Sequence, residues 1–172
     1  VYADEPGAAA APTAGLHFTP ELMATMERRG ATFARITLHV GTGTFRPIRT
    51  ESIHDHEMHT EWFRVTEEAA ARVRKAKRVV AVGTTCVRVL ESLAASSGGT
   101  IEATTGETQL YITPGFEFQV VSAMLTNFHL PGSSLLVLVS AFAGLESTLA
   151  AYNRAIAEGF RFYSYGDAMF IS

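Results

Sequence analysis

The clearest periodic segment of the chain spans residues 32–40, where apolar and polar side chains alternate. Ile36, Leu38 and Val40 therefore share one face of a predicted strand, and the opposite, polar face ends on His39. Segments rich in apolar and β-branched residues predict further strands at 78–82, 109–112, 120–128 and within 160–171.

Predicted helices lie between these strands, and capping residues and glycines mark their ends. Thr19 and Pro20 form a start signal, a capping hydroxyl followed by proline at the first helical position, and Gly30 ends this helix. A second helix begins at Thr66, with acidic residues in its first turn and basic residues in its last, as the helix dipole favours. Three more helices are predicted: after Gly83-Thr84-Thr85 up to Ser96, from Ser133 or Ser134 to Ala143, and over residues 146–158.

Strands that alternate with helices predict an α/β fold, and 172 residues suffice for a single domain over residues 1–172. The chain is 47% hydrophobic and 18% charged, which is typical of a globular protein with a sizeable core. Its net charge of −3 argues against an extensive phosphate-binding surface, although it leaves room for a local basic patch. No apolar run reaches the length of a membrane span, and the single cysteine, Cys86, agrees with a reducing, cytoplasmic compartment.

The stretch Leu38–Ile48 contains Gly41-Thr42-Gly43 directly after the first predicted strand. A dinucleotide-binding loop needs a third glycine and a helix that follows it. This chain has Arg46 at the third glycine position, and no helical pattern begins there. The phosphate-loop interpretation is therefore rejected, and the glycines need another explanation.

A histidine-rich stretch follows, with His54, His56, His59 and Glu61. The spacing H-x-H-x-x-H resembles the zinc motif of the metallo-β-lactamases, and three histidines with a carboxylate are suitable zinc ligands. That motif has an aspartate where this chain has Met58. Polar residues of a loop or strand are therefore the favoured interpretation, and no metal site is predicted.

The predicted strand-to-helix turn at Gly83, Thr84 and Thr85 is a candidate ligand site. The amides of a helix start can bind an anion, and threonine hydroxyls add donors. Arg88 follows one turn later and could hold a carboxylate through two parallel hydrogen bonds. The alternative is an ordinary turn capped by threonine, with Arg88 paired to a nearby glutamate on the surface.

His17 and His129 each stand beside an aromatic residue in a predicted loop, and Asp167 follows a glycine near the end of the chain. A single histidine is more often structural than catalytic, and a single aspartate after glycine is typical of a turn. These three residues are candidates whose significance depends on what surrounds them.

A set of motifs runs through the chain in a fixed order: "APTAGLHFT", "LHVGTGTFRP", the group His56, Met58, His59 and Glu61, "AVGTT-x-VR", the segment Gly106–Phe118, "TNFHLP", "LVSAFAG" and "RFYSYGDAM". Together they cover nearly the whole sequence. In identity and order they resemble the S-adenosylmethionine:tRNA ribosyltransferase-isomerases of queuosine biosynthesis, whose chains are about twice as long.

The resemblance implies a three-layer α/β/α fold that is incomplete in this chain. The family's N-terminal part and its inserted small β-barrel domain have no counterpart in the sequence. The resemblance also implies the reaction, in which the ribosyl part of S-adenosylmethionine is transferred to 7-aminomethyl-7-deazaguanine at the tRNA wobble position and isomerised. Epoxyqueuosine forms, and adenine and methionine leave. The implied partners are tRNA and S-adenosylmethionine, the latter as a substrate, with no cofactor.

Within this reaction, histidines that titrate near neutral pH suit the removal of a proton beside the sulfonium and the departure of adenine. The candidates for catalysis, without individual roles, are His17, His39, His59, Glu61, His129 and Asp167. The candidates for substrate binding are Thr13, Gly15, Gly41, Thr42, Gly43, Gly83, Thr84, Thr85, Arg88 and Asn127. The glycines among them would let the backbone approach a nucleoside closely.

The segments of His17, His39, Thr84 with Arg88, and His129 are expected to converge on one crevice, because each follows apolar sequence in a loop. Two other functions remain open at this point. One is a zinc-dependent hydrolase built on His54, His56 and His59. The other is a tRNA- or nucleoside-binding module without catalytic activity.

Overall fold

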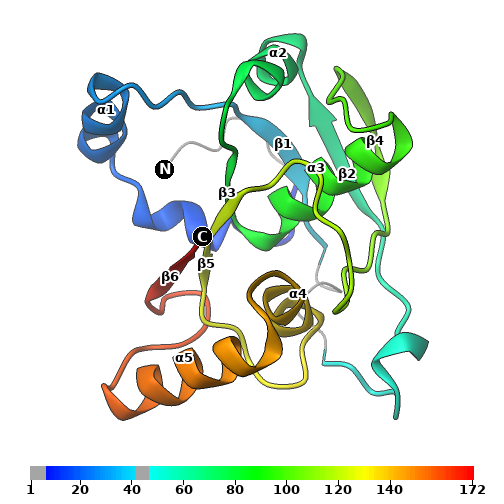
Figure 1. The fold of residues 1–172 in the computed structure, drawn as a ribbon, viewed down its shortest axis with the longest axis vertical. Coiled ribbons are helices and arrows are strands. Elements are labelled where there is room, and N and C mark those ends of the chain that lie inside the picture. The colour runs from blue at the N-terminus through cyan, green and yellow to red at the C-terminus, as the bar shows by residue number, and fades with distance from the viewer. Residues whose placement is uncertain (1–6, 42–46) are drawn as a thin grey trace.

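The computed structural model describes residues 7–41 and 47–172, and its elements follow one another along the chain as helices and strands (Figure 1). The helices are η1 and η3, both 3-10 helices, at Thr13–His17 and Ile53–Asp55, and the α-helices α1 at Pro20–Arg28, α2 at Glu67–Lys75, α3 at Thr84–Ser96, α4 at Ser134–Ala143 and α5 at Leu145–Ala157. The strands are β1 at Ile36–His39, β2 at Glu61–Val65, β3 at Val80–Val82, β4 at Thr104–Thr108, β5 at Ala123–Asn127 and β6 at Ala168–Ile171.

The strands form two small sheets, which confirms the predicted α/β class. One sheet is antiparallel, in the order β1-β2-β4, and pairs Leu38 with Phe63 and Phe63 with Gly106. The other has the order β3-β5-β6, with β3 parallel and β6 antiparallel to β5. β5 is therefore the central strand of the second sheet, and its carboxyl end lies between two edge strands.

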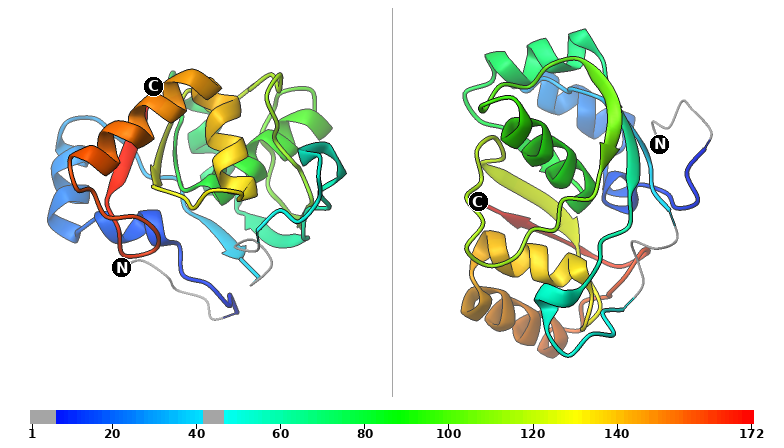
Figure 2. Two further views of the ribbon diagram at one scale, coloured as in Figure 1. Left: turned by 90° about the horizontal axis from the view of Figure 1, so that it is seen from below. Right: turned by 90° about the vertical axis from the view of Figure 1, so that its right-hand side faces the viewer.

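Helix α3 joins the two sheets. It packs against β3 and β5 of one sheet, against β4 of the other and against α4 (Figure 2). Its buried side chains include Val87, Val89, Leu90 and Ala94, which belong to the main hydrophobic core together with residues of both sheets. Burial of several such side chains, each worth about 1.5–3 kcal/mol, makes this helix the centre of the fold.

The helix starts are where the capping residues predict them. The side-chain oxygens of Thr19, Thr66 and Ser133 accept hydrogen bonds from Leu22 N, Ala69 N and Leu136 N, and so satisfy amides that have no partner within their helices. Of the two serines considered for α4, Ser133 is the cap. Gly144 stands between α4 and α5 with a positive φ of 84°.

Three predicted strands differ from the observed ones. Residues 109–112 are not a strand, and the strand of this region is the more polar β4, which ends at Thr108. The backbone of Leu110 instead accepts a hydrogen bond from Arg88 Nε at 2.9 Å. β3 is less buried than predicted, with Val80 45% exposed, because β3 is an edge strand. In the last segment only Ala168–Ile171 is a strand.

Among the described residues, no single helix is long and apolar enough to cross a membrane. α4 and α5 reach that length only as a pair, and they meet at an angle of 114°.

The carboxylate of Glu91 fixes the chain that leads into β5. Glu91 is fully buried on α3, and its two oxygens accept hydrogen bonds from Gln119 N at 2.8 Å, Val120 N at 3.1 Å and Val121 N at 2.8 Å. Three successive amides converge on one anion, an arrangement in which charge-assisted bonds are stronger than neutral ones. α3 therefore positions the start of β5 through a polar contact as well as through the core.

We predict that Glu91→Leu lowers the free energy of unfolding by roughly 3 kcal/mol or more, because three backbone amides, one buried and two partly buried, lose their acceptor. Glu91→Gln, which retains one acceptor oxygen, should give a smaller loss. Denaturant titration of the full-length protein measures both. Glu102→Leu is the matched control at an exposed position, with an expected change within about 0.5 kcal/mol. Equal stabilities for Glu91→Leu and this control would contradict the prediction.

Candidate functional site

Polar side chains gather at the carboxyl end of β5. Asn127 is the last residue of β5, is 3% exposed, and its Nδ2 lies 3.2 Å from Nε2 of His17, the last residue of η1. His17 itself is exposed and can be reached from solvent. The Oδ1 atom of Asn127 is buried and has no hydrogen-bond partner among the described residues. The pair thus combines an accessible imidazole with an amide oxygen that is open to a donor.

His129 lies two residues further along the chain in a different environment. Its Nε2 is 2.8 Å from Oγ1 of Thr126, and its backbone N–H donates to the hydroxyl of Tyr152 at 2.8 Å. Burial lowers the pKa of His129 to about 4, since a charged imidazolium is unfavourable away from water. At neutral pH His129 is therefore an uncharged hydrogen-bonding group.

Asp167 closes the same end of the sheet from the loop before β6. Its carboxylate accepts hydrogen bonds from the side chain and backbone of Arg161, at 3.1 Å and 2.7 Å, and these bonds lower its pKa. A smaller electrostatic effect of His17 lowers the pKa of Asp167 in the same direction. The backbone carbonyl of Asp167 accepts a hydrogen bond from Phe128 N at 3.4 Å, so Asp167 is a carboxylate that lies at the same end of β5 as Asn127.

A cavity and a groove open at this place. The cavity, about 30 Å³, is lined by residues of η1, the end of β5 and the loop before β6: Thr13, Asn127, Phe128, His129, Leu130, Ser133, Leu135, Tyr163 and Ser164. The groove beside it, about 410 Å³, is lined by Ala9–Ala11, Thr13, Leu16 and Tyr163–Tyr165. Thr13, Tyr163 and Ser164 line both. The groove has the size of a small-molecule pocket, whereas the cavity admits only a single chemical group.

The strand-to-helix turn at Gly83 lies next to η1. Gly83 has a positive φ of 94°, and its N–H donates to the carbonyl of Leu125 at 2.8 Å. A Cβ atom at Gly83 would lie 3.8 Å from the Cβ of Ala14, so η1 packs directly over the turn. Thr84 is buried and Thr85 is half-buried. The structure thus brings the expected residues Thr13, Gly15, Gly83 and Thr84 into one neighbourhood with Asn127.

His39 lies on the other sheet, where its ring stacks on Trp62 with centroids 4.5 Å apart. The N-terminal segment connects this region to the groove. A Cβ at Gly7 would come within 2.6 Å of the His39 ring, and Ala9 N donates to Val40 O at 3.0 Å. Ala9 also lines the groove. Gly41 is described and half-buried. The expected contributions of Thr42 and Gly43 lie outside the described residues.

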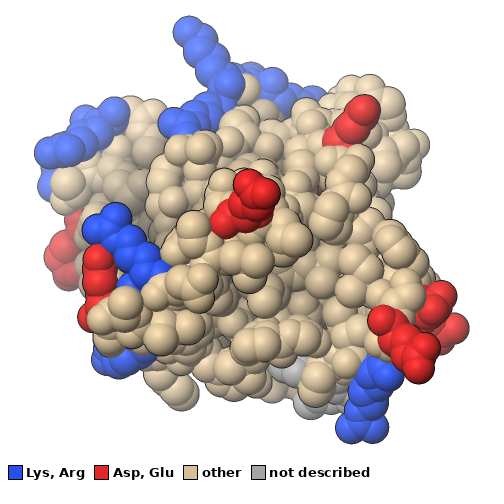
Figure 3. Space-filling model, turned by 60° about the horizontal axis from the view of Figure 1, so that its bottom comes forward, with Lys and Arg blue, Asp and Glu red and all other residues tan. Residues whose placement is uncertain are grey.

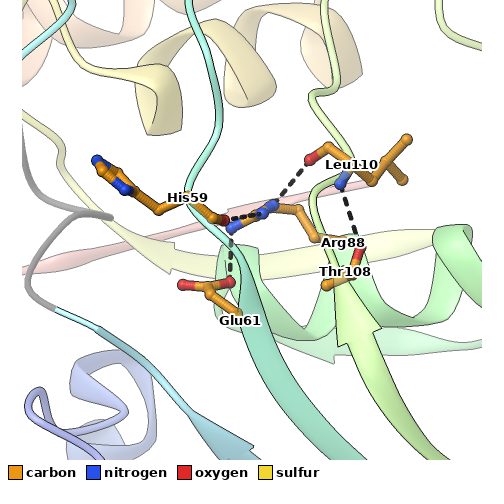
Figure 4. Close-up of polar contacts among 5 residues, drawn as sticks. All are labelled: His59, Glu61, Arg88, Thr108 and Leu110. Atoms are coloured by element: carbon orange, nitrogen blue, oxygen red, sulfur yellow. Dashed lines mark hydrogen bonds and ion pairs between the residues drawn. The ribbon is translucent and has the colours of Figure 1, made fainter.

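The predicted role of Arg88 as a carboxylate ligand is at odds with its position. Arg88 is 1% exposed, and its Nη1 is 2.5 Å from Oε2 of Glu61, which is fully buried (Figure 4). The remaining donors reach the carbonyls of Leu110 at 2.9 Å and His59 at 3.4 Å. Neither Arg88 nor Glu61 is accessible to a substrate, since each charge already has the other as its partner.

His59 and the histidines before it do not support a metal centre. The His59 side chain is exposed and points away from the Arg88–Glu61 pair in Figure 4. His54 lies in η3, and His56 contacts the ring of Tyr111 edge-on at 5.5 Å. Within the described part of the chain, no three His, Cys, Asp or Glu side chains stand together as metal ligands.

Sequence reasoning missed Tyr163, Ser164 and Tyr165, although they belong to the quoted motif "RFYSYGDAM". Tyr163 and Ser164 line both openings and Tyr165 lines the groove, a position that depends on η1 and β5 lying beside the loop in the fold. One face of the molecule carries charged side chains of both signs, scattered mostly near its edge, while uncharged side chains cover most of it (Figure 3).

An α/β domain with polar groups gathered at the carboxyl end of a central strand is the usual architecture of a ligand-binding enzyme domain. Residues 1–171 match the family described as queuosine biosynthesis protein, and the chain belongs to that family.

Proteins of known name that are similar to the chain support the same family. The chain is 53% identical over 175 residues to the S-adenosylmethionine:tRNA ribosyltransferase-isomerase of Heliobacterium modesticaldum, covering 99% of this chain and 51% of the relative. It is 54% identical to the enzyme of the same name from Desulfitobacterium hafniense, with the same coverage. The crystal structure of an S-adenosylmethionine tRNA ribosyltransferase from Thermotoga maritima is similar, with a TM-score of 0.76 and 43% identity over 92% of this chain and 51% of that one. The chain thus spans about half the length of these relatives.

We predict that Arg88→Met lowers the free energy of unfolding by about 3–5 kcal/mol, because it leaves the carboxylate of Glu61 buried without a counter-charge. The double variant Arg88→Met with Glu61→Leu should recover much of the loss, since it removes both charges. Denaturant titration of the full-length protein distinguishes wild type, Arg88→Met and the double variant. If Arg88→Met unfolds at the same denaturant concentration as wild type, the assignment of Arg88 to the scaffold is wrong.

The lowered pKa of His129 predicts a pH dependence of stability. The unfolded chain binds the proton near the ordinary pKa of 6.5 and the folded chain only near about 4. The contribution of His129 to the free energy of unfolding is therefore complete above the unfolded pKa. As the pH falls from that value to the folded pKa, the protein loses up to about 3 kcal/mol of stability. Thermal unfolding of His129→Gln across this range should show a flatter dependence than wild type. Parallel curves would show that His129 protonates freely in the fold.

Proposed function

We propose that the full-length protein transfers the ribosyl part of S-adenosylmethionine to 7-aminomethyl-7-deazaguanine at the tRNA wobble position and isomerises it to epoxyqueuosine, releasing adenine and methionine. Membership of the family supports this proposal. The observation that carries it at the level of residues is the contact between the accessible His17 and the buried Asn127, beside a groove of nucleoside size. The proposed reaction takes place in the cytoplasm and uses no metal or other cofactor.

We assign the mobile proton to His17. The reaction needs a group that removes a proton beside the positive sulfur and one that assists adenine departure. His17 is exposed and directly follows Leu16, which lines the groove, whereas His129 is held neutral by burial. Asn127 suits both protonation states of His17, because an amide can donate through Nδ2 to a neutral ring or accept through Oδ1 from a charged one.

Asp167 has an electrostatic role in this proposal. Its carboxylate stays ionised because Arg161 binds it through two hydrogen bonds, so it is a poor proton donor. A fixed negative charge near His17 stabilises the imidazolium that forms when His17 takes a proton, and it favours a cationic sulfonium substrate. His129 is suited to a neutral hydrogen bond with a purine ring.

The segments around the groove are the proposed binding residues. Thr13 and Gly15 belong to η1, which packs over the turn of Gly83, Thr84 and Thr85 through Ala14. We keep His39, His59, Gly41, Thr42 and Gly43 as candidates for contacts made by the other sheet. Arg88 and Glu61 hold the scaffold behind them.

The experiment is adenine release by the full-length protein from S-adenosylmethionine and tRNA that carries 7-aminomethyl-7-deazaguanine. His17→Gln keeps a polar side chain and removes the titratable ring, so kcat should fall by roughly 10²–10⁴-fold. His54→Gln, at an exposed histidine in η3, is the matched control and should leave kcat unchanged.

Wild-type activity should also survive a metal chelator. No adenine release by wild-type protein would overturn the proposed reaction. Full activity of His17→Gln would overturn the role of His17 while leaving the reaction in place.

A further inference from the structure

The loop before β6 presents two tyrosines at the mouth of the groove. Tyr165 is 89% exposed and Tyr163 is 44% exposed, and both line the groove together with Ser164. Two exposed aromatic rings at one groove, separated by a single residue in sequence, form a flat, amphipathic surface that a ligand can cover. The proposed proton-transfer chemistry uses neither ring.

Backbone hydrogen bonds hold the loop that carries the two tyrosines in a defined conformation. The backbone of Tyr163 has a φ of 75°, a value that residues other than glycine rarely adopt. Its N–H donates to Phe128 O at 2.9 Å. Gly166 N donates back to Tyr163 O at 3.0 Å, and a Cβ at Gly166 would overlap the carbonyl of Arg161. At the base of the loop, the carboxylate of Asp167 accepts hydrogen bonds from the backbone and side chain of Arg161. The loop is thus tied to the end of β5, beside Asn127.

The dimensions of the two openings decide what can sit there. The cavity beside Asn127 holds about 30 Å³ and cannot take a base, whereas the groove holds about 410 Å³. The groove is large enough for a flat aromatic ring, and it shares Thr13, Tyr163 and Ser164 with the cavity. Asn127 Oδ1, buried and without a partner among the described residues, is an acceptor for a donor group in the cavity.

We propose that Tyr165 is a stacking platform for an unpaired RNA base next to the base that is modified. This inference rests on the proposed function, which requires a tRNA loop at this site. Protein side chains recognise RNA loops by stacking splayed bases on aromatic rings, a contact made with the base and not with the phosphate. The chain has a net charge of −3, so ring stacking rather than phosphate binding fits its composition.

The position of Tyr165 favours the RNA base over the adenine of S-adenosylmethionine. Tyr165 stands at the open rim, whereas Thr13 and Tyr163 line the inner part of the groove that continues into the cavity. A small substrate that reacts beside His17 and Asn127 occupies the inner part. A polynucleotide, which extends beyond the groove, reaches the rim.

The test uses the full-length protein, an RNA hairpin with the sequence of a substrate anticodon stem–loop, and S-adenosylmethionine. Tyr165→Ala should weaken hairpin binding by about tenfold or more, because stacking of one base on an aromatic ring contributes an effect of this order. Tyr165→Phe and Tyr165→Trp should retain hairpin affinity, since a stacking ring remains. The affinity for S-adenosylmethionine should not change in any variant.

Phe170→Ala is the matched control, because Phe170 is 56% exposed on β6 and does not line the groove. Unchanged hairpin affinity in Tyr165→Ala, with wild-type adenine release, would overturn the platform alone. A loss of S-adenosylmethionine affinity instead would assign the ring to adenine and also overturn it. A wild-type protein that neither binds the hairpin nor releases adenine would overturn the proposed function as well.

Discussion

The buried ion pair between Arg88 and Glu61 is the constraint on which the arrangement of the site depends. It connects α3 to β2, and the same guanidinium binds the carbonyl of Leu110 after β4. Two ions removed from water are costly unless they bind each other and satisfy their remaining donors. The antiparallel sheet can therefore occupy one position relative to α3, the position in which the pair forms.

The same helix carries the second buried charge, at Glu91, which lies three residues and almost one turn after Arg88. Through the amides of residues 119–121 it fixes the entry to β5, and β5 then delivers Asn127 to the site. One helix thus places both sheets by polar contacts of known geometry. The hydrophobic core supplies stability, but the directional bonds of Arg88 and Glu91 determine the register in which the end of β5 meets η1.

Local signals in the sequence were sufficient for most helices, because a cap such as Thr19 or Ser133 acts on amides within one turn of itself. They were insufficient for Arg88. Its spacing after Gly83 is equally compatible with a ligand site and with a buried pair, and its partner Glu61 lies 27 residues away in sequence. The prediction of a strand at 109–112 was wrong for the same reason. The side chain of Leu110 is apolar and favours a strand, but its backbone carbonyl accepts a hydrogen bond from the distant Arg88.

The candidate site was predicted in part. The motifs around His17, Asn127, His129 and Asp167 were identified from the sequence, and the fold brings these residues together at one end of β5. Their differences could not be predicted, because His17 and His129 have similar neighbours in sequence.

Burial separates the two histidines. His129 lies beside Thr126, its backbone N–H donates to the hydroxyl of Tyr152, and burial holds it neutral with a pKa of about 4, whereas His17 stays exposed. Two imidazoles in one site with distinct environments can carry distinct tasks, one as a proton carrier and one as a neutral hydrogen-bonding group. The difference in environment between the two histidines is therefore a property of the packing at the end of β5, and it depends on the same contacts that orient the strand.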